Sequence, residues 1–184
     1  MALTKTPICN FGEKAKDFYL KSTENKQIAL KDIKGKNGTL VMFICNHCPY
    51  VKAIIKDLVD DVKFLDGLGI KSVSIMSNDV KNYPEDSFEN MISFSKSNNF
   101  SFPYLIDETQ DIAKKYGAVC TPDFFGFNKK MELQYRGRIR ELKNLKPIRK
   151  GDSDLKKAMK LIAETGNGPK NQIPSMGCNI KWFK

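Results

Sequence analysis

Two cysteines separated by two residues are the clearest chemical feature of this chain. Cys45 and Cys48 follow a short apolar run and precede a segment whose apolar residues recur at helical spacing. Two thiols in this arrangement can close a small disulfide without moving the fold. The start of a helix also presents unpaired NH groups and a partial positive charge, which favour a thiolate over a thiol. The pattern therefore predicts a reactive pair that undergoes redox chemistry.

The residue between the cysteines could adjust their chemistry. His47 is the only histidine of the chain. As an imidazolium it would stabilise a neighbouring thiolate and make the disulfide more oxidising. The alternative is a surface side chain near the helix start with no chemical role. We treat His47 as a candidate tuning residue.

Other uses of a Cys-x-x-Cys pair fit this sequence less well. A zinc site of the finger type needs a second pair, and none follows at that spacing. A haem attachment motif needs histidine directly after the second cysteine, where this chain has Pro49. A buried structural pair and a metal chaperone that uses Cys45, His47 and Cys48 are the remaining alternatives. We expect no bound metal or cofactor.

The composition is that of one soluble domain with a full core. Hydrophobic residues make up 41% of the 184 residues and charged residues 28%. The N-terminus lacks the apolar stretch of a signal peptide, and nowhere do about 18 apolar residues run together. The odd number of cysteines, five, argues against a static disulfide framework. We therefore expect a cytoplasmic protein that does not act at a membrane.

The chain is basic, with 31 Lys and Arg against 21 Asp and Glu and a net charge of +10. A charge of this size could suit nucleic acid or an acidic protein partner. However, the excess is mostly lysine scattered along the chain, and no basic cluster is interleaved with aromatic residues. We therefore expect a solvated, lysine-rich surface and no nucleic-acid partner.

Apolar patterning predicts alternating strands and helices. Residues 40–44 indicate a buried strand, a helix follows from Pro49 to about Gly67, and 70–76 indicate the next strand. Two strands joined by such a helix form a parallel, right-handed unit. We also predict two hairpins, one of 17–20 and 27–30 and one of 123–127 and 131–135. Further helices are predicted from 85–87 to 98–99, over 109–116 and from 152–153 to 165. The remaining predictions are an extended segment at 102–106 and a basic loop over 137–151.

The two ends of the chain carry little periodicity. Residues 1–13 indicate an extended arm that holds Cys9, and from Gly166 the chain is polar with two prolines. We predict one domain over 1–165 with an N-terminal extension, followed by a C-terminal tail over 166–184 that forms no element before Cys178.

The order of the predicted elements resembles the thioredoxin fold. This resemblance implies an α/β protein of three layers, with a central mixed sheet flanked by helices. Residues 117–125 look like the segment in which that fold places a cis-proline opposite the two cysteines, which makes Pro122 the candidate. The resemblance implies a backbone edge at Thr121 and Pro122 with which substrates can pair. The alternative is an ordinary trans proline at the start of a strand.

A set of short motifs resembles the redoxin group related to peroxiredoxins, the AhpC/TSA-related family. Peroxiredoxins carry a threonine three residues before the catalytic cysteine and an arginine from a later strand. In this chain Cys45 holds the first of these positions, and Thr121 falls near the second. The motifs are Asp17-Phe18 and residues 30–35, 45–50, 77–79, 83–87, 120–123 and 177–178.

The resemblance implies a thiol-disulfide oxidoreductase that cycles Cys45 and Cys48 between dithiol and disulfide. In the thioredoxin-like mechanism the Cys45 thiolate attacks a substrate disulfide, and Cys48 resolves the mixed disulfide. The alternative is an antioxidant peroxide reductase, in which Cys48 becomes a sulfenic acid that Cys45 resolves. The implied partners are a protein disulfide or a peroxide, with a thioredoxin-type reductant.

Two further cysteines exceed what a two-cysteine cycle requires. Cys120 is held within roughly 7 Å of Pro122 along the chain. Cys178 lies on the tail, which we predict docks near the mouth of the active site with Ile180 and Trp182 as an apolar anchor. There Cys178 would act as an auxiliary thiol. The alternative is a tail cysteine that is packed for structure or simply exposed.

Overall fold

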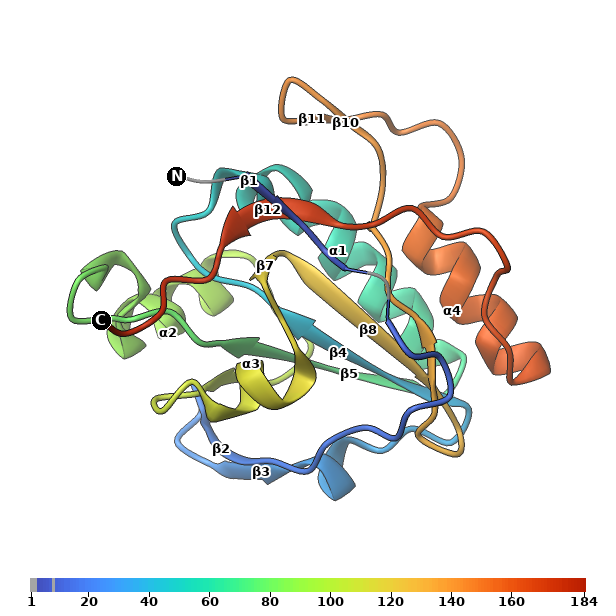
Figure 1. Ribbon diagram of the computed structural model, residues 1–184, viewed down its shortest axis with the longest axis horizontal. Helices are drawn as coiled ribbons and strands as arrows, with labels where there is room; N and C mark the ends of the chain where they lie inside the picture. Colours follow the sequence, from blue (N-terminus) through green and yellow to red (C-terminus); the bar gives the residue numbers. More distant parts are fainter. Residues whose placement is uncertain (1–2, 8) are drawn as a thin grey trace.

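The computed structural model describes residues 3–7 and 9–184. Its centre is a seven-stranded mixed sheet in the order β3-β2-β6-β5-β4-β8-β9 (Figure 1). The strands of this sheet are β2 (Tyr19–Ser22), β3 (Gln27–Ala29), β4 (Gly38–Phe43), β5 (Ile70–Met76), β6 (Tyr104–Ile106), β8 (Asp123–Asn128) and β9 (Leu133–Tyr135). The helices are α1 (Pro49–Gly67), α2 (Phe88–Ser97), α3 (Asp111–Tyr116) and α4 (Asp154–Thr165).

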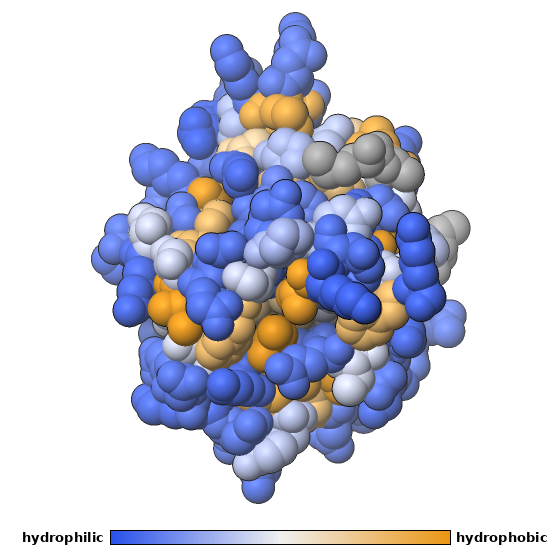
Figure 2. Space-filling view, turned by 90° about the vertical axis from the view of Figure 1, so that its left-hand side faces the viewer, coloured by the Kyte–Doolittle hydropathy of each residue, from blue (hydrophilic) through white to orange (hydrophobic). Residues whose placement is uncertain are grey.

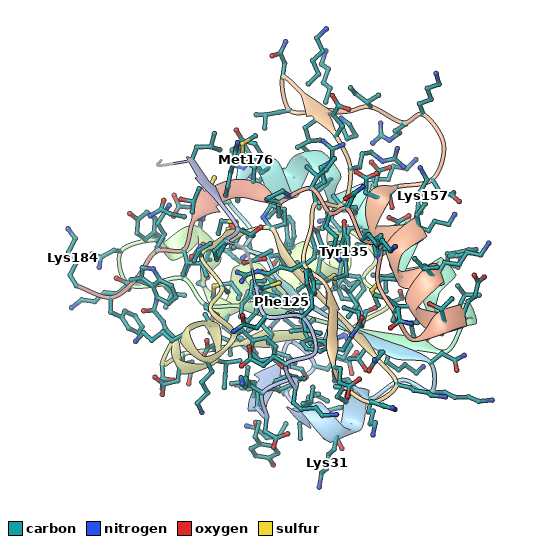
Figure 3. The ribbon with its side chains drawn as sticks, turned by 45° about the vertical axis from the view of Figure 1, so that its right-hand side comes forward. Lys31, Phe125, Tyr135, Lys157, Met176 and Lys184 are labelled. Carbon is teal, nitrogen blue, oxygen red and sulfur yellow. The ribbon has the colours of Figure 1, made fainter. Side chains whose placement is uncertain are left out.

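Helices cover both faces of the sheet, so the molecule has three layers. The buried residues of α1, α2 and α4 pack with Leu40 and Met42 on one face. Those of α3 pack with Val41 and Phe43 on the other. Because neighbouring residues of a strand point to opposite faces, a strand at the centre is apolar throughout. In Figure 3, Phe125 and Tyr135 of the β8–β9 hairpin lie in the interior, each in a different one of these two cores.

The predicted strand, helix and parallel strand around the cysteines are confirmed. Strand β4 pairs in parallel with β5 and antiparallel with β8. Pro49 occupies the first turn of α1, and Cys48 is its N-cap residue. Helix α1 buries one face, and the chain turns after it at Gly69, whose φ of 77° suits glycine. The buried face consists of Val51, Ile54, Asp57, Leu58, Asp61, Val62 and Leu65.

The other predicted elements are present, with shifted boundaries. Strands β2 and β3 form the first hairpin, and β8 and β9 form the second. Helix α3 ends at Gly117 in the left-handed region, and Ser153 caps α4 by accepting from the Lys156 NH. Helix α2 begins later than predicted because residues Pro84–Asp86 form a separate 3₁₀ turn, η2, and Ser87 caps the helix. Within the predicted loop 137–151, Leu142–Lys143 (β10) pairs with Lys146–Pro147 (β11).

The two ends of the chain form a second sheet. Its order is β1 (Leu3–Lys5), β12 (Met176–Asn179) and β7 (Cys120–Thr121), and Figure 1 shows β1 in blue beside β12 in red. The prediction that the tail docks onto the domain is confirmed. The prediction that it forms no element before Cys178 is wrong, because β12 begins at Met176.

Figure 2 shows one side of the molecule covered largely by hydrophilic residues, with apolar side chains in small groups among them. Within residues 3–7 and 9–184, the helices are too short or too polar to cross a bilayer.

Candidate active site

The site forms where β4 and α1 meet the loop before β8. The Thr121-Pro122 peptide bond is cis, which confirms the prediction for Pro122. The Cys45 Sγ lies 3.4 Å from the Thr121 Oγ1, and the Cys48 Sγ lies 3.2 Å from the Thr121 carbonyl oxygen. The proline loop therefore faces both cysteines, as predicted. All five cysteines of the chain are in the reduced form, and Cys45 and Cys48 are fully buried.

The surroundings of Cys48 favour its thiolate. A hydrogen bond from the Cys45 thiol contributes most to lowering the pKa of Cys48 to about 5. Burial opposes this shift, whereas hydrogen bonds from the Cys178 thiol and the Val51 NH support it. The N-cap position adds the partial positive charge of the α1 terminus. Cys48 is therefore the more acidic thiol of the pair, the one whose thiolate these surroundings favour.

Cys45 behaves in the opposite way. The hydrogen bond that it gives to Cys48 contributes most to raising its pKa well above the ordinary value, and burial and the charge of Asp86 act in the same direction. Cys45 is therefore a thiol when Cys48 is a thiolate. This order favours Cys48 as the attacking thiolate, the role it has in the peroxide alternative, whereas the thioredoxin-like mechanism expects Cys45 in that role.

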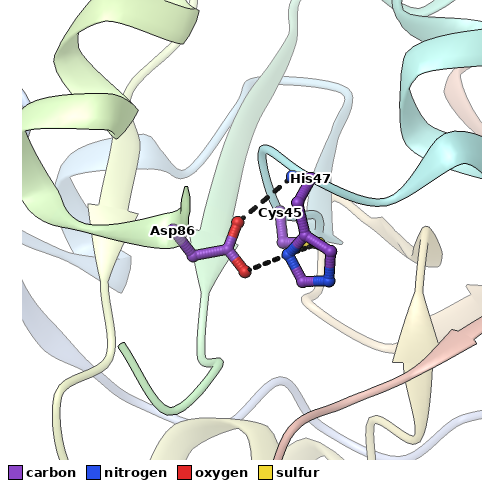
Figure 4. Close-up of side chains that lie close together, drawn as sticks. All are labelled: Cys45, His47 and Asp86. Carbon is purple, nitrogen blue, oxygen red and sulfur yellow. Dashed lines mark hydrogen bonds and ion pairs between the residues drawn. The ribbon is translucent and has the colours of Figure 1, made fainter. Parts of the chain in front are cut away.

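A buried carboxylate organises the turn between the cysteines (Figure 4). Asp86, in η2, accepts hydrogen bonds from the backbone NH of Asn46 at 2.8 Å and of His47 at 3.2 Å. Its other oxygen lies 2.6 Å from the His47 Nδ1 and accepts from the Asn78 side chain at 2.7 Å. Burial disfavours the charge of Asp86, but the bonds from His47 and Asn78 outweigh it and lower the pKa of Asp86.

His47 is held by this carboxylate. The hydrogen bond with Asp86 raises the pKa of His47 despite partial burial, and the ring stacks on Tyr83 with centroids 5.8 Å apart. The His47 Nδ1 is 3.9 Å from the Cys45 Sγ, so the imidazole lies beside Cys45. The sequence motif 83–87 contains Asp86, but these residues were interpreted only as a family motif and as the start of a helix.

Three of these groups could in principle ligate a metal. The side-chain donors of Cys45, His47 and Asp86 lie within 4.8 Å of one another. This set differs from that of the metal-chaperone alternative, which had Cys48 in place of Asp86. However, both oxygens of Asp86 are already engaged by the donors of Asn46, His47 and Asn78, so a metal would have to displace these bonds. The arrangement is that of a hydrogen-bond network that positions the turn.

The loop that carries Pro122 is supported by a buried ion pair. The Arg136 Nη2 lies 2.9 Å from the Asp123 Oδ2, and both side chains are almost completely buried. Burial raises the pKa of Asp123 to about 6 although Arg136 opposes the shift. Arg136 also donates to the Gly117 carbonyl at 2.7 Å, so it ties the end of α3 to the start of β8.

The two auxiliary cysteines differ in position. Cys120 is buried, and its Sγ lies 3.6 Å from the Pro122 carbonyl oxygen. Burial raises the pKa of Cys120, so it is a thiol at neutral pH. The Cys178 Sγ, in contrast, lies 3.1 Å from the Cys48 Sγ. Burial and the neighbouring Cys48 raise the pKa of Cys178 to about 12.

The tail is anchored mainly by Ile180. This residue is buried in the core beside α3, as predicted. Trp182 is 38% exposed, with the Lys114 ammonium 6.0 Å from its ring, so it contributes less to the anchor than the sequence suggested. Strand β12 pairs antiparallel with β7 so that Cys178 lies opposite Thr121. The backbone edge that we expected substrates to use is therefore occupied by the chain's own tail.

Comparisons with known proteins agree with this geometry. The model of the AhpC/TSA family matches residues 11–136. The chain is 27% identical over 117 residues to sporulation thiol-disulfide oxidoreductase A of Bacillus subtilis, covering 64% of this chain and 67% of that protein. It is 29% identical over 129 residues to the thiol-disulfide oxidoreductase ResA of Bacillus thuringiensis, covering 68% of each protein.

Solved structures extend the similarity to the whole chain. An uncharacterized conserved protein from Geobacillus kaustophilus is 37% identical and superposes with a TM-score of 0.94, covering 100% of this chain and 97% of that one. The thioredoxin domain of a thiol-disulfide oxidoreductase from Bacteroides vulgatus is 14% identical, with a TM-score of 0.59 over 70% of this chain and 89% of that one. This second likeness concerns the fold alone, and it confirms the predicted thioredoxin-like architecture.

Proposed function

Because this chain belongs to the AhpC/TSA family, we propose that it is a thiol-disulfide oxidoreductase that cycles Cys45 and Cys48 between dithiol and disulfide. The observation that carries this proposal is the position of Cys48 at the N-terminus of α1. Its pKa is lowered to about 5, mainly by a hydrogen bond from the Cys45 thiol. Two relatives of the chain are named thiol-disulfide oxidoreductases, which supports the same reaction type.

The pKa order of the two cysteines assigns their roles in this proposal. The Cys48 thiolate attacks one sulfur of a substrate disulfide, the substrate S–S bond breaks, and the other substrate sulfur leaves as a thiolate. Cys45 then loses its proton and attacks the Cys48 sulfur, which releases the second substrate thiolate and forms the Cys45–Cys48 disulfide. The substrate gains two electrons and the cysteine pair loses two. A thioredoxin-type reductant would return the pair to the dithiol.

His47 and Asp86 have a positioning role in this scheme. The His47 ring lies beside Cys45, whose proton must leave during resolution. Asp86 holds that ring and the backbone NH groups of the turn, so it fixes the geometry of the cysteine pair. Thr121 contacts both sulfurs, Cys45 through its hydroxyl and Cys48 through its carbonyl oxygen.

Reduction of a protein disulfide such as those of insulin, with a dithiol as the electron source, tests the proposal. We expect Cys48→Ser to abolish turnover and Cys45→Ser to accumulate a mixed disulfide with the substrate. Cys9→Ser is the matched control, because Cys9 lies on the N-terminal arm and is not one of the two cysteines assigned to the cycle. Thiol counting after mild oxidation should show the loss of Cys45 and Cys48 together. Turnover by Cys48→Ser at the wild-type rate would refute the assignment.

Reduction of peroxides is the second candidate function. The family membership and the thiolate character of Cys48 favour it. The Cys48 thiolate would attack one peroxide oxygen, the O–O bond would break, and the other oxygen would leave as hydroxide or alkoxide and take up a proton. The Cys48 sulfenic acid would then condense with the Cys45 thiol to a disulfide with release of water. Stopped-flow reaction with hydrogen peroxide, run beside the insulin assay, compares the two. A rate with peroxide far above that with a disulfide would make this the main activity.

A further inference from the structure

The tail strand β12 pairs with the edge of β7, next to the reactive sulfurs. Strand β12 pairs with β7 on one side and with β1 on the other, and Cys178 is opposite both Thr121 and Leu3. This register brings the Cys178 Sγ to 3.1 Å from the Cys48 Sγ. Cys48 thus contacts two thiols, Cys45 from its own turn and Cys178 from the tail.

Several contacts hold β12 in this position without a covalent bond. The buried Ser175 hydroxyl donates to the Pro122 carbonyl at 2.7 Å, and the Thr6 NH donates to the Ser175 carbonyl at 3.0 Å. Gly177 packs directly on the proline loop, where a Cβ would lie 2.0 Å from the Thr121 carbonyl oxygen and 3.1 Å from the Pro122 Cδ. The two sulfurs need to approach by only about 1 Å to reach disulfide bonding distance.

We infer that Cys178 is a third redox thiol of this protein and that Cys48 exchanges its disulfide between Cys45 and Cys178. Strand β12 acts as an internal substrate strand, paired with Thr121 and presenting its cysteine to Cys48. The inference rests on the proposed function, which supplies the Cys45–Cys48 disulfide or a mixed disulfide on Cys48.

The exchange needs no external oxidant, because one disulfide forms as another breaks. The Cys178 sulfur gives up its proton and attacks the Cys48 sulfur of the Cys45–Cys48 disulfide. The bond between Cys48 and Cys178 forms, the bond between Cys45 and Cys48 breaks, and Cys45 takes up a proton. From a mixed disulfide, the same attack releases the external thiol instead of Cys45. The Cys48–Cys178 disulfide fixes the tail covalently over the pair.

Mixed-disulfide lifetimes in the full chain test this step. Reduced Cys45→Ser protein is treated with oxidised glutathione, and its disulfides are mapped by peptide mass spectrometry over time. Cys178 should release glutathione from Cys48 and leave a Cys48–Cys178 disulfide. The adduct should persist at least about ten-fold longer in the Cys45→Ser, Cys178→Ser double variant, since a tethered thiol has a high effective concentration.

Two outcomes would overturn the inference. Equal adduct lifetimes in the single and double variants would refute it, while the proposed function would stand if wild-type protein still forms the Cys45–Cys48 disulfide. No reaction at Cys48 in any variant, the wild type included, would refute both proposals.

A glycine variant keeps all three thiols and tests the role of β12. Gly177→Ala should push β12 off the proline loop and lengthen the adduct lifetime in the Cys45→Ser background by a similar factor. Gly67→Ala, at a position with open space for a Cβ, is the matched control and should leave the lifetime unchanged. A short lifetime in the Gly177→Ala protein would contradict the role of the strand. Near-UV circular dichroism of each variant verifies that it is folded.

Discussion

At neutral pH the reduced protein should carry one thiolate, and Cys48→Ser should remove it. The pKa of Cys48 is lowered from 9.0 to about 5. At pH 7 a thiol with a pKa near 5 is about 99% ionised, whereas one with a pKa near 9 is about 1% ionised. Thiolate absorbance at 240 nm should therefore rise with a midpoint near pH 5 in the wild type. The step should be absent from the Cys48→Ser protein.

The size of this shift has energetic consequences. Four pKa units correspond to about 5 kcal/mol of preference for the thiolate in the folded state. Because the folded pKa lies below the unfolded one, this stabilisation is fully present above about pH 9 and is lost as the pH falls through about 5. As the pH falls from about 9 to about 5, the free energy of unfolding of the wild type, relative to that of Cys48→Ser, should decrease by about 1.4 kcal/mol per pH unit.

The same ionisation should make the Cys45–Cys48 disulfide more oxidising. At pH 7 only the part of the shift between a pKa of about 5 and pH 7 contributes, and it stabilises the dithiol form by about 3 kcal/mol. This is equivalent to a reduction potential higher by about 60 mV. Equilibration with glutathione buffers of known ratio measures this potential. Cys45→Ala removes the largest of the interactions that lower the pKa of Cys48, so its absorbance step should move to higher pH.

The control for these experiments is Cys9→Ser, which should retain the step near pH 5. The reasoning would be refuted by a wild-type protein without any thiolate step below pH 7. It would also be refuted by a step near pH 5 that persists in Cys48→Ser.

Two further predictions concern the residues around the cysteines. Asp86→Asn should lower the raised pKa of His47 toward 6.5, and since His47 is the only histidine, NMR titration of its single ring signal measures the change directly; an unchanged midpoint would contradict the network. Arg136→Met should leave the Asp123 carboxylate buried without its partner and lower the free energy of unfolding in urea by about 3 to 5 kcal/mol. Lys71→Ala, which removes an exposed pair, should lower it by less than about 1 kcal/mol, and a similar loss in both variants would count against the special role of Arg136.

Local patterns in the sequence were sufficient to predict the central part of the fold. The strand β4, the helix α1 and the strand β5 follow from an apolar run, a proline at a helix start and a second apolar run. The ends of α3 and α4 follow from Gly117 and Ser153, whose effects depend only on nearby residues. Strand β12, in contrast, has the sequence MGCN, which carries no strand signal. It forms because distant partners supply the pairing on both sides.

The candidate site was predictable in its residues more than in its electrostatics. Cys45, Cys48 and the cis bond at Pro122 follow from spacing and from resemblance to a known fold. Asp86 could not be recognised as part of the site because its principal contacts are with residues about 40 positions earlier in the chain. The order of the two cysteine pKa values depends on burial and on which thiol donates to the other, and neither property is visible in a motif.

The occupied edge at Thr121 also affects how strongly any substrate can bind. If substrates pair with the Thr121 edge, as expected from the sequence, β12 fills the position that an incoming strand would need, and only the fraction of molecules with β12 displaced could bind such a strand. The apparent affinity of a substrate is reduced by that fraction: each ten-fold decrease in the open population weakens binding ten-fold. Under that expectation a good substrate would have to pair with Thr121 better than the protein's own residues Met176–Asn179 do, and substrate choice would be a competition between strands for one edge.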